Sequence, residues 1–276
     1  MKDYIGAADP GPWAQVDLSD KGDAERHVFL LGFPRSGTTL LEQVLASHPQ
    51  VVTLDERTAM VDAEVEFLSS PEGLDRLARL EGQELKLFRD AYWGRIKAFG
   101  LDVRGKVFID KFPLATMKLP LIAKLFPHAK VLFAVRDPRA VALSCFRRGF
   151  GMNPSMYQFV TLEGTARFYD AVMALGEACR AKLPLTVHEV RYEALVEDFD
   201  ATARAVADFI GLEWSEALRD FAQTAQTRAI RTPSASQVRR GLYSDALQQW
   251  RKYQDQLAPA LPILRPWVEK FGYEAD

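Results

Sequence analysis

A glycine-bounded loop joins an apolar run to a helix-like run near the start of this chain. Residues 32–39 are Gly-Phe-Pro-Arg-Ser-Gly-Thr-Thr, and residues 27–31 before them are His-Val-Phe-Leu-Leu. A strand, a glycine-bounded turn and a helix start form a phosphate cradle, because loop amides and the positive helix end converge on one anion. The segment therefore predicts an anion site. An ordinary strand–turn–helix corner is the alternative interpretation.

The loop differs at one position from the nucleoside-triphosphate loop whose spacing it shares. Where that loop has Lys after its second Gly, this chain has Thr38. Because that Lys reaches the β- and γ-phosphates, its absence argues against ATP or GTP. Arg35 instead places a planar cation inside the turn. A planar cation suits a single phosphate or sulfate-like group.

A second strand-to-helix corner follows later in the chain. Residues 131–135 are an apolar run typical of a buried parallel strand, and Asp137 and Pro138 suit the cap and first position of a following helix. Arg136 then ends a strand, where open α/β sheets bind ligands. Ser144 lies about two turns into the helix. These two side chains are candidates for a second phosphate site, although Arg136 pairing with a neighbouring carboxylate is an alternative.

Together the two corners resemble those of the sulfotransferases that use 3′-phosphoadenosine 5′-phosphosulfate (PAPS). The similarity is closest to the tyrosylprotein sulfotransferases and to bacterial sulfotransferase domains linked to TPR repeats, and it runs from about residue 27 to the end of the chain. It implies that the chain transfers a sulfuryl group from PAPS to an acceptor hydroxyl and releases adenosine 3′,5′-bisphosphate (PAP). A donor with two separate anionic ends, and no triphosphate, also explains the missing Lys.

The resemblance implies a catalytic base. Glu56, just after a predicted strand at 51–53, matches the catalytic Glu of the tyrosylprotein enzymes. From the residues alone, Asp55 and Glu56 equally suit the first turn of a helix. Asp55 is the alternative base, and His48 and His188 are weaker rivals.

The resemblance also implies two further catalytic residues. Lys111 matches the Lys that meets the sulfuryl and bridging oxygens, where a cation stabilises charge that moves onto the leaving group. A surface ion pair with Asp110 is the alternative for that side chain. Ser234 matches the Ser near the sulfuryl group.

The remaining implied contacts hold the donor. The first loop would bind the 5′-phosphosulfate, and the second corner would bind the 3′-phosphate. A later Tyr would contact the nucleotide, with a packed ring as its alternative. A loop at 231–240 would close over the cofactor, with a solvated basic loop as its alternative. The candidates in the first loop are Arg35, Ser36, Gly37, Thr38 and Thr39, and those of the second corner are Arg136, Ser144 and Arg148. The Tyr is Tyr192, and the candidates in the closing loop are Arg239 and Arg240.

Two of the predicted donor contacts have alternative residues. Arg147 is an alternative to Arg148 for the 3′-phosphate. Gln249 stands before Trp250 where the tyrosylprotein enzymes carry Lys. Arg239, Arg240 or Arg251 would then supply the charge of the closing loop.

Strand patterns that alternate with helix patterns predict an α/β fold. We expect a P-loop-containing parallel sheet flanked by helices, the three-layer fold of sulfotransferases. Strands are predicted at 27–31, 51–53, 107–109, 131–135 and 185–190. Residues 1–26 are expected to be an irregular arm, and 27–276 a single sulfotransferase domain.

Charge and cysteine content narrow the partners. The chain has 35 basic and 37 acidic residues, a net charge of −2, so nothing indicates nucleic acid. The two cysteines, Cys145 and Cys179, form no metal-ligand pattern, so we expect no metal; two free thiols in a reducing cytoplasm are the simple interpretation, and one disulfide is the alternative. With no signal peptide and no membrane-spanning run, the expectation is a cytoplasmic protein. A homodimer stays open.

The acceptor is the least constrained part. A peptide, a glycan or a small molecule would each bring a hydroxyl, and Trp93, Phe150 and Tyr157 are candidates for lining its cleft, with core packing as their alternative. Two other functions are retained. One is a P-loop kinase or other phosphotransferase, with Asp110 as its best metal-binding carboxylate. The other is a non-catalytic nucleotide-binding domain.

Overall fold

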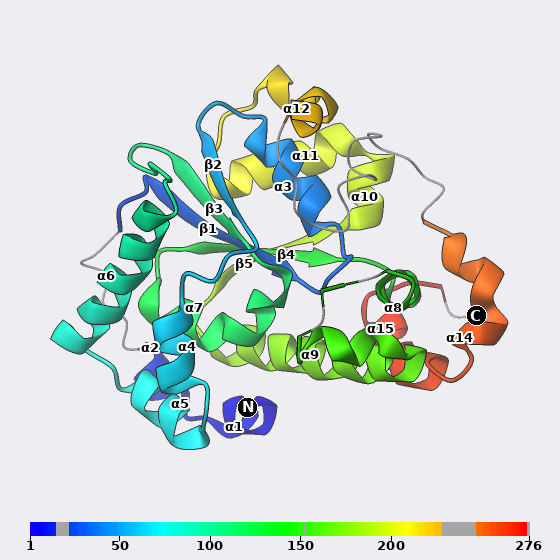
Figure 1. The fold of residues 1–276 in the computed structure, drawn as a ribbon, viewed down its shortest axis with the longest axis horizontal. Coiled ribbons are helices and arrows are strands. Elements are labelled where there is room, and N and C mark those ends of the chain that lie inside the picture. Colours follow the sequence, from blue (N-terminus) through cyan, green and yellow to red (C-terminus); the bar gives the residue numbers. More distant parts are fainter. Residues whose placement is uncertain (15–21, 149, 152, 228–246, 275–276) are drawn as a thin grey trace.

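The computed structural model describes residues 1–14, 22–148, 150–151, 153–227 and 247–274. Its centre is a parallel sheet of five strands in the order β2-β3-β1-β4-β5 (Figure 1). The strands are β1 (Arg26–Gly32), β2 (Val51–Asp55), β3 (Val107–Lys111), β4 (Lys130–Val135) and β5 (Thr186–Arg191). All five predicted strands are therefore present. The predicted α/β fold, a parallel sheet flanked by helices, is confirmed.

Helices cover one face of the sheet above the strands in Figure 1. They are α3 (Thr38–Ala46), α10 (Tyr192–Glu197), α11 (Phe199–Ile210) and α12 (Phe221–Thr227), with the 3-10 turn η3 (Glu216–Leu218) before α12. Val28, Leu30 and Ile109 point to this face and pack among the apolar residues of these helices. Alternate strand residues face opposite ways, so the next residues along each strand form a second core.

That second core is larger and lies under the opposite face. Phe29, Phe108 and Phe133 pack there against α6 (Gly82–Ala98), α7 (Leu119–Leu125) and the long α9 (Leu162–Lys182). Around them lie α4 (Val61–Phe67), α5 (Pro71–Ala78), η1 (Pro113–Lys118), α8 (Pro138–Phe146), η2 (Met156–Val160), η5 (Gln249–Tyr253), α14 (Gln254–Leu257) and α15 (Leu261–Lys270). No helix among the described residues is long and apolar enough to span a bilayer.

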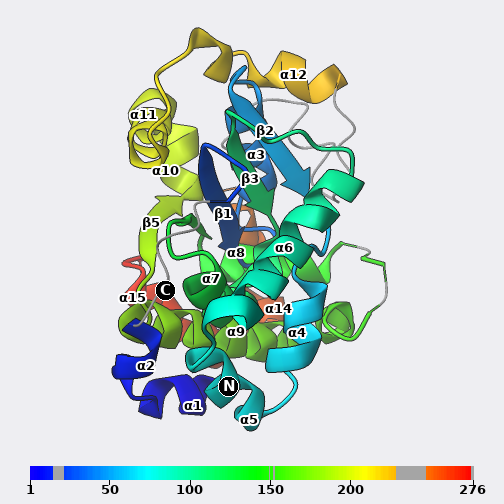
Figure 2. The ribbon, with the colours of Figure 1, turned by 90° about the vertical axis from the view of Figure 1, so that its left-hand side faces the viewer.

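Where the sequence predicted an irregular arm, residues 2–14 form two short helices, α1 (Lys2–Ala7) and α2 (Pro10–Ala14). Helix α1 packs beside α9, at the lower end of the molecule in Figure 2. Ile5 and Trp13 are almost fully buried, and Lys124 Nζ donates a 3.3 Å hydrogen bond to Pro12 O. Tertiary packing therefore orders a Pro- and Gly-rich stretch that local propensity alone leaves irregular.

Candidate active site

The carboxyl ends of the five strands meet at one edge of the sheet, and several of the predicted site residues lie there. Asp55 ends β2, and Lys111 ends β3 in register with it. Arg136 directly follows β4, and Tyr192 directly follows β5. The loop after β1 lies between these two pairs, since β1 is the central strand. This is the edge where parallel α/β sheets bind ligands.

Hydrogen bonds to backbone oxygens hold the loop between β1 and α3. Thr116 Oγ1 donates to Gly32 O at 2.6 Å, and Arg136 Nη1 donates to Arg35 O at 3.3 Å. Arg35 adopts a left-handed backbone conformation with φ of 71°, which is uncommon outside glycine. Its side chain is largely buried in the turn, as the sequence predicted for the cation of this loop.

The loop also depends on a close approach at Gly37. This residue has φ of 97°, and an added Cβ would lie 2.6 Å from Tyr192 Cδ2. The Arg136 guanidinium lies 4.4 Å from the centroid of the same ring. Tyr192 therefore packs between the first loop and Arg136, the residue that follows β4, and its ring is largely buried.

The two predicted anion sites adjoin each other. Arg35 Nε, in the first loop, donates a 2.9 Å hydrogen bond to Ser144 Oγ on α8. Arg136, at the start of the second corner, donates to the backbone of Arg35. The two corners are therefore parts of one site.

The other predicted donor contacts lie at the margin or outside the described residues. Arg148 is exposed just beyond α8, and the Arg147 guanidinium lies 4.9 Å from the Tyr253 ring centroid. Gln249 begins η5 next to the buried Trp250. The predicted residues Ser234, Arg239 and Arg240 fall in 228–246, outside the described residues.

Lys111 is completely buried among three carboxylates. Its Nζ lies 2.8 Å from Glu56 Oε1 and 3.6 Å from Glu42 Oε2, and it donates a hydrogen bond to Asp55. Thr53 Oγ1 donates to the other oxygen of Glu42 at 2.8 Å. Burial lowers the pKa of Lys111, but the attraction of Glu42, Glu56 and Asp55 outweighs it, so the pKa is raised and the ammonium stays charged.

The catalytic role of Lys111 that the resemblance implies stays a prediction. The resemblance implied contact with the sulfuryl oxygens, whereas in this structure the ammonium faces Glu56 and its neighbours, and the side chain has no exposed surface. The ammonium contacts Glu56 directly, at 2.8 Å from its Oε1. Sequence reasoning did not identify Glu42, because it lies within the apolar run of α3. An acidic residue at a buried position of that helix was the available signal.

Glu56 has the second unusual backbone conformation of the site. Its φ is 49°, and its N–H donates a 2.9 Å hydrogen bond to Lys111 O. Its side chain keeps 37% of its surface exposed, unlike Glu42 at 1%. A carboxylate held in an unfavourable conformation and still open to solvent is typical of a functional position.

A pocket opens beside Glu56. Its volume is about 70 Å³, and it is lined by Pro34, Arg35, Thr38, Thr39, Glu56, Phe112, Pro113, Leu114, Phe150 and Met156. The first loop and Glu56 form the polar wall, and the residues after β3 together with Phe150 and Met156 form the apolar wall. The pocket therefore joins the first anion site to the candidate base.

The three aromatic residues predicted as candidates for lining the acceptor cleft lie in different places in the structure. Phe150 lines the pocket. Trp93 is instead buried against His27 and Phe108, with ring centroids 4.9 and 5.9 Å away. Tyr157 is 62% exposed and is not among the lining residues. Of the three, Phe150 is the one placed to contact an acceptor.

The rival histidines lie away from the pocket. His48 Nδ1 accepts a 3.1 Å hydrogen bond from the Gln50 amide, and burial lowers its pKa. His188 stacks on Phe209, with ring centroids 5.0 Å apart. Neither of them lines the pocket.

Asp110 faces the opposite side of the sheet from Lys111. Tyr92 donates a 2.9 Å hydrogen bond to Asp110 Oδ2, and burial raises the pKa of Asp110 to about 7. A kinase would need this carboxylate beside the phosphate loop to hold a metal ion. Within the described residues, no group of three His, Cys, Asp or Glu side chains is arranged for a metal.

Comparison with known sequences gives one consistent result. The model of the sulfotransferase family matches residues 27–216. An uncharacterized protein of Aquifex aeolicus is 27% identical over 256 residues, and the match spans 90% of this chain but only 33% of that protein. Protein-tyrosine sulfotransferase 1 of Danio rerio is 26% identical over 266 residues, spanning 90% of this chain and 72% of the fish protein.

Solved structures share the fold. The sulfotransferase domain of the Synechococcus PCC 7002 olefin synthase has a TM-score of 0.58 and 23% identity, and covers 95% of this chain and 100% of that domain. A mouse sulfotransferase complexed with PAP has a TM-score of 0.51 and 15% identity over 90% of each chain. At these identities the likeness extends to the fold alone.

Proposed function

The chain belongs to the sulfotransferase family, and from this premise we propose that it transfers a sulfuryl group from PAPS to an acceptor hydroxyl and releases PAP. The observation that carries the proposal is the link between the two corners. Arg35 Nε donates to Ser144 Oγ at 2.9 Å, and Arg136 donates to the Arg35 carbonyl. Two cationic corners joined in this way suit one ligand with two anionic ends.

The donor would lie across the central strands. Arg35, the amides of residues 36–39 and the hydroxyls of Thr38 and Thr39 would hold the 5′-phosphosulfate at the start of α3. Arg136 and Ser144 would hold the 3′-phosphate, with Arg148 or Arg147 closing over it. The Tyr192 ring, already against Arg136, would contact the nucleotide. The mouse enzyme of the same fold was solved with PAP, which supports a nucleotide of this kind.

The chemical step would take place in the pocket beside Glu56. The acceptor oxygen attacks sulfur, Glu56 accepts its proton, and the bond from sulfur to the bridging oxygen breaks with its electron pair going to the 5′-phosphate. Arg35 and the first turn of α3 stabilise the charge on that phosphate. Lys111 orients Glu56 through the 2.8 Å contact. Asp55, which shares Lys111, is the alternative base, and no metal ion is needed for any of these steps.

The acceptor would present a hydroxyl to Glu56 with its body against Phe112, Phe150 and Met156. The Danio rerio relative is by name a protein-tyrosine sulfotransferase, so a tyrosyl peptide is the first acceptor to test. A glycan and small hydroxyl compounds are the next two classes.

The phosphotransferase alternative is not favoured. Thr38 replaces the Lys that binds a triphosphate, and Asp110 faces α6 on the far side of the sheet from α3. Neither group that a P-loop kinase requires is therefore beside the loop.

The test is a pair of measurements on the same preparation. Calorimetric titration should give a dissociation constant for PAP at least about tenfold lower than that for ATP, with or without Mg²⁺. Sulfur-35 labelled PAPS, screened against the three acceptor classes, should then label at least one of them, and labelling should fall in Glu56→Gln. Tighter binding of ATP than of PAP would refute the donor. PAP binding without transfer to any class would favour the non-catalytic alternative.

A further inference from the structure

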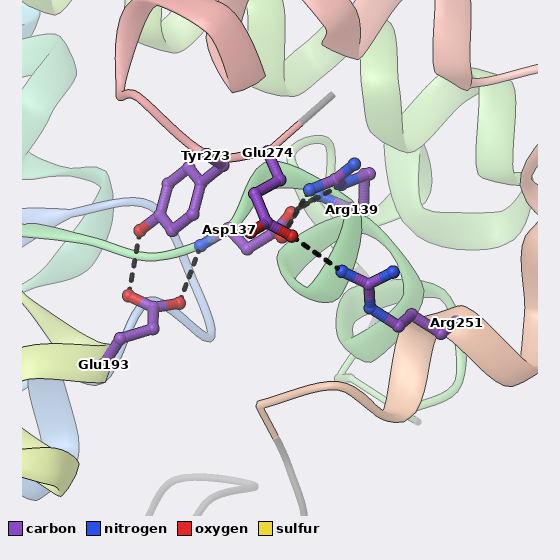
Figure 3. A network of polar contacts seen from close by, with 6 residues as sticks. All are labelled: Asp137, Arg139, Glu193, Arg251, Tyr273 and Glu274. Carbon is purple, nitrogen blue, oxygen red and sulfur yellow. Dashed lines mark hydrogen bonds and ion pairs between the residues drawn. The ribbon is translucent and has the colours of Figure 1, made fainter. Parts of the chain in front are cut away.

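A carboxylate outside the proposed chemistry braces the corner after β4. Glu193 Oε1 accepts a 3.0 Å hydrogen bond from the Asp137 backbone N–H, and Glu193 Oε2 accepts a 2.8 Å hydrogen bond from the Tyr273 hydroxyl. Figure 3 shows both bonds, with Glu193 on α10 and Tyr273 just beyond α15. One side chain therefore connects three segments that are far apart in sequence.

The braced positions are the immediate neighbours of two donor-binding candidates. Asp137 follows Arg136, and Glu193 follows Tyr192. Their strands are adjacent, since Val135 of β4 pairs with Arg191 of β5. A rigid bridge between Asp137 and Glu193 therefore sets how the Arg136 guanidinium sits over the Tyr192 ring, 4.4 Å from its centroid.

Tyr273 is itself held in place. The Arg191 guanidinium lies 5.2 Å from its ring centroid, and Arg191 also donates a hydrogen bond to Phe271 O. Phe271 is buried against the core. Burial and the neighbouring Glu193 charge raise the pKa of the Tyr273 hydroxyl, so it remains protonated and donates to the carboxylate at neutral pH.

We infer that Tyr273 and Glu193 are positioning residues for the 3′-phosphate grip, and that they act by holding the Arg136–Asp137 turn against Tyr192. The inference rests on the proposed function, because it presupposes that Arg136 binds the 3′-phosphate of the donor. It predicts a defect confined to ligands that carry that phosphate. A loss of general stability would weaken every ligand alike.

The decisive variant is Tyr273→Phe, which removes one hydroxyl and changes no charge. Its matched control is Tyr4→Phe, since Tyr4 OH also donates to a carboxylate, Asp75 Oδ1 at 2.5 Å, but joins α1 to α5. Calorimetric titration would compare PAP with adenosine 5′-phosphate, which lacks the 3′-phosphate. Tyr273→Phe should weaken PAP about five- to tenfold and leave adenosine 5′-phosphate within about twofold, the size expected for one charge-assisted hydrogen bond. Tyr4→Phe should change neither.

Glu193→Asp provides a second variant that keeps the charge. The side chain is one methylene shorter, so it cannot reach both Asp137 N and Tyr273 OH, and PAP should weaken at least as much as in Tyr273→Phe. Thermal unfolding of each variant confirms that it is folded. Equal weakening of both ligands, or no weakening in either variant, would overturn the inference while leaving the donor assignment in place. A wild-type protein that does not prefer PAP over adenosine 5′-phosphate would overturn the donor assignment, and the inference with it.

Discussion

Lys111 Nζ lies 2.8 Å from Glu56 Oε1, so the residue that ends β3 holds the residue that follows β2. The backbone repeats this link, because Glu56 N–H donates to Lys111 O at 2.9 Å. Two contacts therefore fix Glu56 at the pocket wall in its left-handed conformation. The arrangement places an oriented carboxylate beside the first anion site.

Replacing Glu56 by Gln should remove the catalytic base while keeping the size and shape of the side chain. Proton acceptance by a positioned group contributes about 10²- to 10⁴-fold, so turnover should fall by that order. PAP affinity should stay within about twofold, because Glu56 does not touch the 3′-phosphate corner. Initial rates at saturating PAPS measure the first quantity. Asp55→Asn is the companion variant. If Asp55→Asn lost activity while Glu56→Gln retained it, the two carboxylates would exchange roles.

Replacing Lys111 by Met should destabilise the protein strongly. The change leaves Glu42, Asp55 and Glu56 without their shared cation, and removing one partner of a buried ion pair costs about 3–5 kcal/mol. Urea unfolding at pH 7 measures this. The control is Lys86→Met, because Lys86 pairs with Asp90 on the surface and should cost less than about 1 kcal/mol.

A second change separates charge from packing at Lys111. Adding Glu42→Gln to Lys111→Met removes the most buried of the uncompensated carboxylates, so part of the lost stability should return. Purely additive losses in the double variant would show that Glu42 and Lys111 do not interact.

Gly37→Ala should impair donor binding. The new Cβ would lie 2.6 Å from Tyr192 Cδ2, so the ring must leave its present position between Gly37 and Arg136. We expect PAP affinity to fall by more than about tenfold, measured by titration. Gly105→Ala is the matched control, since Gly105 also has positive φ but no atom lies within 4 Å of an added Cβ. Both variants should lose about 1–2 kcal/mol of stability from the backbone, and only Gly37→Ala should lose PAP.

His27 and Asp110 are both buried, and their titrations should have opposite effects on the free energy of unfolding as the pH changes. Burial lowers the pKa of His27 to about 3, so the unfolded state takes up the extra proton below pH 6.5 and stability rises with pH from about 3 to 6.5. Burial raises the pKa of Asp110 from 3.8 to about 7, so the folded state holds the extra proton and stability falls as pH rises through that window. The two slopes, each up to about 1.4 kcal/mol per pH unit, largely offset each other.

Asp110→Asn should remove the contribution of Asp110, so that the rise of the free energy of unfolding with pH that His27 causes becomes measurable. Relative to wild type, the variant should gain stability as pH rises from about 4 to 6.5, by up to about 1.4 kcal/mol per pH unit. Urea unfolding at several pH values measures the difference. The other groups near Asp110 are the same in both proteins: Tyr92, Lys118, Glu64 and Lys111. Parallel stability curves for the two proteins would rule out a raised pKa for Asp110.

The strands and the loop could be predicted because their signals are local. An apolar run followed by Gly32, Gly37 and a helix start needs no tertiary information to be recognised. The helices α1 and α2 could not be predicted in this way, because Pro10 and Gly11 disfavour helix locally and the burial of Ile5 and Trp13 comes from distant segments.

Candidate site residues that lie at the end of a strand could be predicted from the sequence. Residues that contact the site only through another side chain could not. Arg35 and Arg136 were predicted from their places in strand-to-helix corners, whereas Tyr192 was predicted from the family resemblance. Glu42 and Tyr273 lie on a helix and beyond one, and only the folded structure brings them to Lys111 and Glu193. The exclusion of Lys111 from the pocket is likewise a product of packing, since its sequence position is equally compatible with an open side chain.

The order of the strands has a consequence for how such a protein diversifies. The wall that would meet an acceptor is built from segments after β2 and β3 and from residues 150 and 156, whereas the residues that would grip the 3′-phosphate follow β4 and β5. Phe112, Phe150 and Met156 line the pocket and Arg136 and Tyr192 do not, so mutations that enlarge or reshape that side leave Arg136 and Tyr192 untouched. Libraries restricted to that side would therefore search for new acceptors at constant donor affinity.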